Sequence, residues 1–246
     1  MRALVVSDLH ANSEALAAVF KRVRRKKFDT VMCLGDFVGY GAHPNQILDT
    51  MRTLKTRKVF IRGNHDRVAS GLGDADGFNN AAKASALWTR EHLSPTNRRF
   101  LRDLVQGPLT HNEAMLCHGS PYDEDEYVFN VHHAAQVLAL YKAPFILYGH
   151  THLPAVFSID EESNVSGFAV RGEATVKLDP KLRYLINPGS VGQPRDRNPD
   201  SAFIILDTEK HTAQFFRVEY DIAKTQSAIL KAGLPEILAT RLSYGT

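Results

Sequence analysis

The chain has few of the features that stabilise secreted domains or anchor proteins in membranes. It contains two cysteines, Cys33 and Cys117, and each lies in an apolar run, where cysteines are usually buried thiols rather than halves of a disulfide. No segment approaches the roughly 18 consecutive apolar residues of a membrane-spanning helix. The apolar run Ala3–Val6 after Met1 is too short for a signal peptide. We therefore expect a soluble, cytoplasmic protein without a membrane partner.

Neither sign of charge dominates the sequence. Thirty Lys and Arg residues stand against 27 Asp and Glu residues, and the net charge of +3 gives no global argument for a nucleic-acid partner. One local cluster is basic and lies at the end of an expected helix: Arg22, Arg24, Arg25, Lys26 and Lys27. A solvated helix C-terminus, where positive charge is favourable, explains this cluster better than contact with a membrane or a nucleic acid does.

The 246 residues contain no internal repeat, linker or low-complexity stretch, so we expect one domain spanning 1–246. Short β-rich runs alternate with amphipathic helical segments, which is typical of an α/β fold. The opening is β-α-β-α-β and implies parallel pairing. We expect its strands at Ala3–Val6, Thr30–Leu34 and Val59–Ile61, and its helices after a cap at Asn12 or Ser13 and over Asn45–Leu54.

Later segments predict more helices and a second sheet. Ser94 suits an N-cap and Pro95 the first helical position, so a helix is expected to start there. Other helices are expected over Ala81–His92, near His132–Tyr141 and over Asp221–Ala232, the last one ending at Gly233 and Pro235. The expected strands are Ala114–Cys117, Phe145–Tyr148, Tyr184–Asn187, Phe203–Leu206 and Ala213–Tyr220.

Five short motifs place a metal-ligand residue type directly after an expected strand, where α/β proteins gather their sites. The motifs are Asp8-Leu9-His10, Gly35-Asp36, Gly63-Asn64-His65-Asp66, His118-Gly119 and Gly149-His150-Thr151-His152. Carboxylate, imidazole and amide donors without thiolate suit Mn, Fe, Zn or Ni, and the glycines allow tight turns beside an ion. Each motif alone is weak evidence, but five in this order predict a hydrolytic metal centre.

In their order and residue types the motifs resemble those of the calcineurin-like metallophosphoesterase superfamily. The resemblance extends from Ala3 to the segment Asn187–Asp196, which is similar to the bacterial and archaeal small-phosphodiesterase branch. It implies a four-layer α/β/β/α sandwich, in which helices flank two mixed sheets and the metal centre lies at the strand ends.

The resemblance also implies a cofactor of two divalent metal ions and a role for each motif. Asp8, His10 and His152 would bind the first ion, and Asn64, His118 and His150 the second. Asp36 would bridge ions about 3.5–4 Å apart, a separation at which one water touches both. The resulting hydroxide would attack phosphorus in line, without a covalent enzyme intermediate.

His65 and Asp66 are the expected catalytic residues. His65 follows a metal ligand in what we expect to be an extended loop, pointing to the opposite side, which suits a general acid or a charge stabiliser at the leaving oxygen. Asp66 is expected to orient the imidazole through a hydrogen bond. The alternative is that the pair only stabilises the loop.

Other polar residues near the motifs are less specific. Asn12 is interpreted first as a helix cap, and Arg67 and Arg195 either contact substrate phosphate or form loop salt bridges. The expected pocket rim comprises Tyr40, Asn79, Asn80 and Tyr122. The remaining histidines are interpreted as surface or core residues: His43, His92, His111, His132, His133 and His211.

One departure from the family pattern narrows the expected activity. Phosphoprotein phosphatases and symmetrical diadenosine-tetraphosphate hydrolases carry Gly-Asp-x-Val-Asp-Arg-Gly, whereas Gly35–Gly41 lacks that arginine. We therefore expect a phosphodiesterase or phosphomonoesterase acting on a small, nucleotide-like phosphate ester. The alternatives are a phosphoprotein phosphatase, which would need a shallow open cleft, and a non-catalytic scaffold such as the retromer subunit of this architecture.

Overall fold

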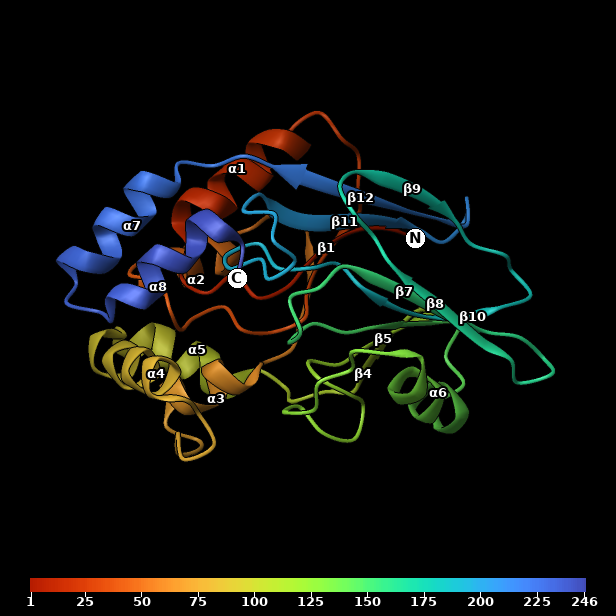
Figure 1. Ribbon diagram of the computed structural model, residues 1–246, viewed down its shortest axis with the longest axis horizontal. Helices are drawn as coiled ribbons and strands as arrows, with labels where there is room; N and C mark the ends of the chain where they lie inside the picture. Colours follow the sequence, from red (N-terminus) through yellow and green to blue (C-terminus); the bar gives the residue numbers. More distant parts are fainter.

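The computed structural model describes residues 1–246 and contains two six-stranded mixed sheets (Figure 1). The first sheet has the order β3-β2-β1-β11-β12-β9. Its strands are β1 (Arg2–Val6), β2 (Thr30–Cys33), β3 (Arg57–Phe60), β9 (Ala174–Lys177), β11 (Ser201–Asp207) and β12 (Thr212–Val218). The second sheet has the order β4-β5-β6-β10-β7-β8. Its strands are β4 (Leu109–His111), β5 (Ala114–Leu116), β6 (Phe145–Leu147), β7 (Ala155–Ile159), β8 (Val165–Ala169) and β10 (Arg183–Asn187).

The structure has eight α-helices and one 3-10 helix, some of which cover the outer faces of the sheets. They are α1 (Ser13–Val23), α2 (Pro44–Arg52), α3 (Asn64–Ser70), α4 (Asn80–His92), α5 (Pro95–Asp103), α6 (Val131–Leu140), α7 (Ile222–Lys231), α8 (Glu236–Thr240) and the 3-10 helix η1 (Arg241–Tyr244). Helices α1 and α2 pack on the first sheet, and α6 packs on the second. The four-layer sandwich expected from the sequence is therefore confirmed.

Strand β1 shows why the layers form. Successive side chains of a strand point to opposite faces, so Ala3 and Val5 join the core between the two sheets, while Leu4 and Val6 join the core under α1 and α2. Both faces are buried, which explains an uninterrupted apolar run. The β-α-β-α-β opening is confirmed, because β2 pairs in parallel with both β1 and β3.

Several short elements were missed in the sequence. Strand β8 contains Gly167 and is exposed along most of its length, so it lacks the alternation that marks a half-buried strand. Strands β4, β7 and β9 and helix α8 are only three to five residues long, which is too short to show a hydrophobic period. Short elements of this kind form through tertiary contacts rather than through local pattern.

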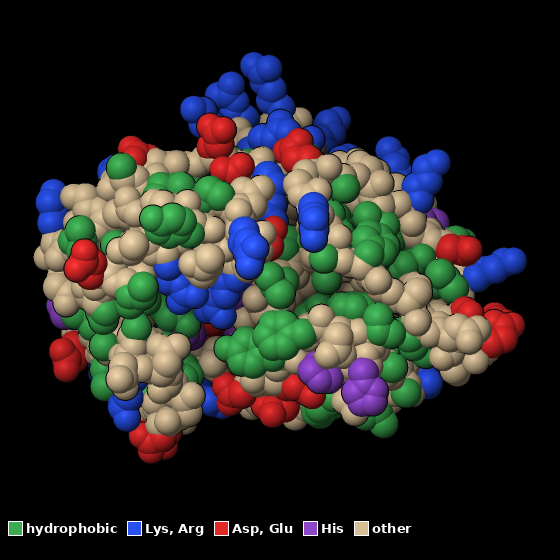
Figure 2. All heavy atoms as spheres, viewed as in Figure 1, with side chains coloured by type: hydrophobic (Ala, Val, Ile, Leu, Met, Phe, Trp, Pro, Cys, Tyr) green, Lys and Arg blue, Asp and Glu red, His purple; other side chains and the backbone are tan.

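The structure also shows where the two cysteines and the basic cluster lie. Cys33 and Cys117 are free and buried, as expected. No helix has the length and apolar character needed to cross a membrane. Lys and Arg side chains project over the end of α1 (Figure 2). Lys26 Nζ lies 4.6 Å from the ring centroid of Phe216, and Arg22 Cζ lies 5.5 Å from it. Part of the basic cluster is thus packed against the fold.

Candidate metal centre

The five motifs meet at one edge of the sandwich, where neighbouring parallel strands end. Strands β1, β2 and β3 supply donors from the first sheet, and β5 and β6 supply them from the second. The seven expected metal ligands lie here, and none is more than 7% exposed: Asp8, His10, Asp36, Asn64, His118, His150 and His152. The fold therefore concentrates carboxylate, amide and imidazole groups in one buried place.

The backbone at this edge is unusually strained. Five of the seven residues have left-handed φ angles: 54° at Asp8, 45° at His10, 54° at Asp36, 63° at His150 and 61° at His152. This conformation costs a non-glycine residue about 1–2 kcal/mol, and such strain persists only where the surrounding structure enforces it. These five left-handed turns accompany the convergence of their side chains on the common centre.

Two glycines permit the close approach of the motifs. A Cβ atom on Gly63 would lie 2.2 Å from Asp36 Oδ1, and one on Gly149 would lie 2.0 Å from Ser7 Oγ and 3.1 Å from Asp8 Oδ2. A side chain at Gly63 would displace the Asp36 carboxylate, and one at Gly149 would displace the Ser7 hydroxyl and press on Asp8. Close approach thus requires glycine here, as the sequence suggested.

The donors form two groups joined by one carboxylate. Donor atoms of Asp8, His10 and His152 lie within 4.8 Å of one another, and so do those of Asp36, His118 and His150. Asp36 Oδ2 lies 3.6 Å from His10 Nε2 and 3.4 Å from His118 Nε2, so it stands between the groups. Asn64 Oδ1 is 3.3 Å from His118 Nε2.

Backbone carbonyls orient all four imidazoles. The Nδ1 atoms of His10, His118 and His152 face the carbonyls of Val38 (3.1 Å), Leu34 (2.7 Å) and Gln193 (2.5 Å). In His150 the ring is reversed, and Nε2 faces the carbonyl of Asp125 at 3.1 Å. A carbonyl can only accept, so each facing nitrogen carries the proton. In His10, His150 and His152, whose pKa values burial lowers, the other nitrogen is left with a lone pair.

These lone pairs crowd together without donors to satisfy them. His10 Nε2 and His152 Nε2 are 3.1 Å apart, and Asp8 Oδ2 is buried without a hydrogen-bond partner. Several acceptors facing one another repel unless a cation lies between them. The residues therefore fit divalent metal ions.

Burial and mutual attraction shift the pKa values of these groups. Burial raises the pKa of Asp8 to about 7 and lowers that of His150 to about 3. Burial alone would raise the pKa of Asp36, but His118 and His65 outweigh it and hold that pKa below its usual range. Burial likewise opposes the charge on His118, yet Asp36 raises its pKa to about 10. Asp36 thus attracts positive charge most strongly.

The expectations for His65 and Asp66 need correction. The segment is not an extended loop, because helix α3 begins at Asn64. Asp66 does not orient the imidazole: its carboxylate accepts hydrogen bonds from Gly63 N (3.0 Å) and Val38 N (3.2 Å). A helix start leaves N–H groups unpaired, and Asp66 is placed to satisfy one of them.

His65 nevertheless faces the centre. Its ring packs between Tyr40 and Phe78, with centroids 4.4 and 4.6 Å away, and lies 5.1 Å from that of His10. Its backbone N–H donates to Asp36 Oδ1 at 2.9 Å. Burial lowers the pKa of His65 to about 4, so the ring is neutral. Packing, not a carboxylate partner, sets its direction.

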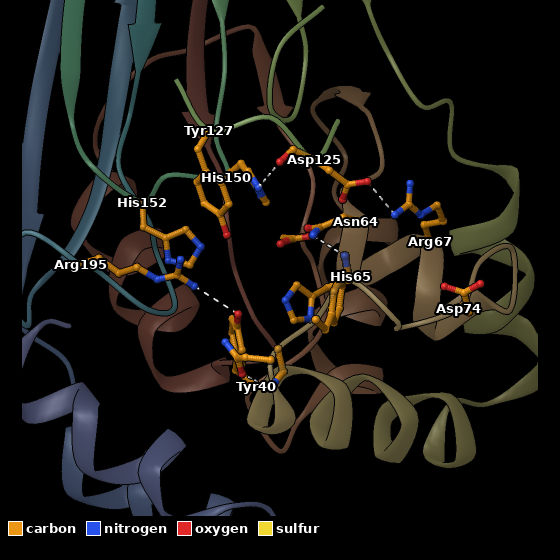
Figure 3. A pocket seen from close by; sticks show the side chains of 15 residues that line it. Tyr40, Asn64, His65, Arg67, Asp74, Asp125, Tyr127, His150, His152 and Arg195 are labelled. Carbon is orange, nitrogen blue, oxygen red and sulfur yellow. Dashed lines mark hydrogen bonds and ion pairs between the residues drawn. The ribbon is translucent and has the colours of Figure 1, made fainter. Parts of the chain in front are cut away.

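A pocket of about 490 Å³ opens above the centre (Figure 3). Tyr40 and Asn79 line it, as expected from the sequence, and Arg67 and Arg195 line it as well. Two predicted rim residues were wrong. Asn80 lies outside the lining, and Tyr122 is 46% exposed and donates to Glu126 instead.

Other lining residues were missed in the sequence: Asp74, Phe78, Asp125 and Tyr127. Asp125 and Tyr127 follow the His118-Gly119 motif within one loop, and this nearness was the one available signal. Asp74 and Phe78 come from the segment between α3 and α4, which carries no ligand motif. None of the six remaining histidines lines the pocket, in agreement with the sequence interpretation.

Side-chain contacts bear on three residues whose roles the sequence left open. Arg67 forms a loop salt bridge, with Glu124 at 2.6 Å and Asp125 at 2.9 Å. Arg195 donates to uncharged acceptors, Gln193 Oε1 and the Tyr40 hydroxyl. Asn12 caps α1 by accepting from Ala15 N at 3.1 Å, which confirms the cap interpretation.

Comparison with known proteins gives a consistent result. A family model described as the calcineurin-like phosphoesterase superfamily domain matches residues 1–211. An uncharacterized protein of Methanocaldococcus jannaschii is 36% identical over 251 residues, which cover 98% of this chain and 97% of that protein. The crystal structure of a metallophosphoesterase from Sphaerobacter thermophilus is 36% identical, with a TM-score of 0.87 over 100% of this chain and 99% of that one.

A more distant structure shares the fold. A hypothetical protein from Pyrococcus horikoshii OT3 is 20% identical, with a TM-score of 0.81 over 100% of this chain and 98% of that one. The family match covers most of the sequence, and its residues include all five motifs. The chain therefore belongs to the calcineurin-like phosphoesterase superfamily.

Proposed function

We propose that this protein is a dinuclear metal-dependent phosphoesterase that hydrolyses a small phosphate mono- or diester. The observation that carries the proposal is the arrangement of seven buried donors in two groups, with Asp36 Oδ2 within 3.6 Å of an imidazole nitrogen of each. A structural metal site would need only one closed group of four ligands. Two groups that share a carboxylate and open on a pocket favour catalysis.

The chain's own residues divide into two ligand sets. Asp8, His10 and His152 would hold one ion, Asn64, His118 and His150 would hold the other, and Asp36 would contact both. When bound, such a pair of ions lowers the pKa of a shared water and neutralises charge on the phosphoryl oxygens. The donor types suit Mn, Fe, Zn or Ni.

His65 is the residue we assign to the leaving group. It lines the pocket beside Asp36 and is neutral at physiological pH, so a ring N–H can donate a hydrogen bond to a substrate oxygen. Positioned proton transfer or charge stabilisation of this kind contributes roughly 10²–10⁴ in rate. Tyr40 and Phe78 fix the ring by packing and so limit its motion.

The depth of the site favours a small ester over a protein substrate. Four of the donors, Asp36, Asn64, His150 and His152, line a pocket of about 490 Å³, and the other three are buried outside its lining. This volume is in the range of small-molecule sites. A phosphorylated side chain of a folded protein would need a shallower cleft. A non-catalytic scaffold is also disfavoured, because all seven donors and His65 are retained.

The test is hydrolysis of p-nitrophenyl phosphate and bis-p-nitrophenyl phosphate by metal-stripped protein, with Mn, Ni, Zn or Mg added back. We expect metal-dependent release of nitrophenol and a fall of roughly 10²-fold or more in His65→Ala. The diester-to-monoester ratio selects between the two activities. Folded protein that binds no transition metal and stays inactive with every ion would overturn the proposal.

A further inference from the structure

The two sheets end in four edge strands, and β8 differs from the other three. A strand at a sheet edge has unpaired backbone groups, and proteins usually prevent its pairing with another chain by charged side chains or by shortness. Strand β3 carries Arg57 and Lys58, β9 ends in Lys177, and β4 has only three residues. Strand β8 has five residues, Val165–Ala169, and none of them is charged. It is therefore the edge with the least protection against pairing.

The hydrogen bonds of the β7–β8 hairpin show which backbone groups of β8 face outward. At one end of the hairpin Val170 N donates to Pro154 O at 2.9 Å, and at the other end Asp160 N donates to Asn164 O at 3.2 Å. Because hydrogen-bonded and non-hydrogen-bonded pairs alternate along an antiparallel ladder, the even-numbered residues of β8 bond to β7. The backbone groups of the odd-numbered residues point away from β7 and have no hydrogen-bond partner in the chain: Val165, Gly167 and Ala169.

These outward groups are self-complementary about Gly167. When two copies are related by a two-fold axis, their β8 strands run antiparallel, and Gly167 can face Gly167 of the second copy. Val165 then faces Ala169 of the second copy, and each facing pair can exchange two backbone hydrogen bonds. In this register the exposed ring of Phe168 comes within reach of Phe168 of the second copy, its diagonal neighbour.

The charges that flank β8 fit the same arrangement. Glu162 lies in the turn before β8 and Arg171 follows the strand, and both are exposed without a salt bridge in the chain. In the two-fold register Arg171 comes next to Glu162 of the second copy, and symmetry repeats this pair. Glu173, which would come opposite Glu161 of the second copy, is already paired with Arg22 at 3.1 Å. The flanking charges therefore favour the antiparallel pairing.

An apolar groove beside β8 extends this surface toward the metal pocket. Its volume is about 250 Å³, and its lining includes Phe129, Val131 and Phe168, which are 54%, 40% and 53% exposed. The Phe129 ring stacks on Tyr127 at 5.2 Å, and Tyr127 lies 4.0 Å from the His150 ring and lines the metal pocket. A second copy bound at β8 would shield these apolar side chains and would lie beside the rim of the pocket.

We propose that β8 is a dimerisation strand, through which two copies of this chain join their second sheets edge to edge about a two-fold axis. Strand addition at an exposed edge gains main-chain hydrogen bonds, and two-fold dimers are the commonest protein oligomers. Phe168 supplies apolar contact, and the pairs of Glu162 with Arg171 set the strand direction. Because a five-residue edge makes a small interface, we expect a dissociation constant in the micromolar range.

Sedimentation equilibrium from micromolar to near-millimolar concentration tests whether the dimer forms. Ser166→Lys places a charge on the exposed face of β8 beside Phe168 of the second copy, and we expect it to weaken the dimer about tenfold or more. The matched control is Thr175→Lys, at an exposed position of the edge strand β9, which should leave the dissociation constant unchanged. Thermal unfolding establishes that each variant is folded. A monomeric wild type, or equal constants in the two variants, would overturn the inference.

A designed disulfide tests the register. Ser166 would face Phe168 of the second copy as a non-hydrogen-bonded pair, with Cα atoms about 4.5 Å apart, which is within the range that a disulfide spans. We expect oxidised Ser166→Cys/Phe168→Cys to migrate as a dimer that a thiol reductant separates. Thr175→Cys/Lys177→Cys places the same spacing on β9 and should remain monomeric, since the two native cysteines are buried. Absence of the cross-link in folded Ser166→Cys/Phe168→Cys would refute the proposed pairing of β8.

Discussion

The floor and the rim of the pocket are built in different ways. By the floor we mean the seven donors that follow strand ends, of which Asp36, Asn64, His150 and His152 line the pocket. Backbone carbonyls fix the direction of its imidazoles. The rim consists of side chains from loops and helices, held by side-chain contacts such as Arg67–Glu124 and Arg195–Tyr40. The main chain thus determines the chemistry, while the rim can change its residues, and with them its specificity, without disturbing the fold.

The strongest test of this difference removes charge from the floor alone. Asn at position 36 keeps the shape of Asp36 and can still accept from His65 N. We expect Asp36→Asn to lower kcat/KM with Mn by roughly 10³-fold, beyond the 10–100-fold loss typical of residues that only support ligands. Asp74→Asn, a carboxylate on the rim of the same pocket, is the control and should have a far smaller effect. Similar losses in both variants would contradict the division.

Metal binding should also stabilise the protein through the floor. At a free ion concentration about 100 times Kd, binding adds about 2.7 kcal/mol to the free energy of unfolding. For a chain of this length that corresponds to a rise in Tm of roughly 5–10 °C. Scanning calorimetry of metal-stripped protein with and without Mn measures the shift. Asp36→Asn should show a reduced shift, and an unchanged Tm in wild type would mean that the lone pairs are satisfied in another way.

A rim residue that lies next to a support of a metal ligand should have an intermediate effect on metal affinity when it is substituted. Glu124 is buried between Arg62 and Arg67, and the next residue supplies the carbonyl that orients His150. Glu124→Gln keeps the shape but leaves both guanidiniums without their shared counter-charge. We expect roughly a tenfold lower affinity for the second metal, as for other supporting residues, measured by titration with Mn.

Asp125→Asn provides the matched control for Glu124→Gln. It removes a carboxylate from the same arginine, but its side chain is 43% exposed. Exposed pairs contribute about 0–1 kcal/mol, so its metal affinity should stay close to that of wild type. Equal losses of metal affinity in the two variants would show that the position of Glu124 does not influence the orientation of His150.

The smallest expected effect is a difference in stability between substitutions of two adjacent residues, Asn79 and Asn80. The Asn79 side chain accepts from Ala82 N at 2.9 Å and caps α4, whereas Asn80 is the first residue of that helix and its side chain makes no hydrogen bond. Asn79→Ala should lower the free energy of unfolding by about 1 kcal/mol, or about 2–4 °C in Tm. Asn80→Ala should stay within roughly 0.5 kcal/mol of wild type. Equal Tm values for the two variants would contradict the capping role.

The same division explains which features could be predicted from the sequence. Floor residues lie within a few positions of apolar strands, so local pattern locates both the strand and its donor, as at Asp8 after β1 and His118 after β5. Helix α3 was missed because Gly63-Asn64-His65-Asp66 is polar and has no apolar periodicity; the helix forms by capping on Asp66 and by packing of its inner face.

Rim contacts could not be predicted, because they join residues that are far apart in the chain. Tyr40, Arg195 and Arg241 come together only when the C-terminal helices pack on the loop after β2. Nothing local to Arg195 places it beside Tyr40, which lies 155 positions away in the chain. Arg67 shows the reverse case: it lies next to a motif, yet Glu124, 57 positions away, determines its charge environment.

The hydrogen bonds that orient the four imidazoles affect how the centre responds to mutation during evolution. Their acceptors are main-chain oxygens of Leu34, Val38, Asp125 and Gln193, and a codon change replaces a side chain but never a peptide carbonyl. Point mutation therefore cannot delete these supports one at a time, as it could delete supporting carboxylates. Ring orientation at this centre should therefore be conserved together with the topology of the strands. Related proteins can then diverge in substrate specificity while keeping the same metal centre.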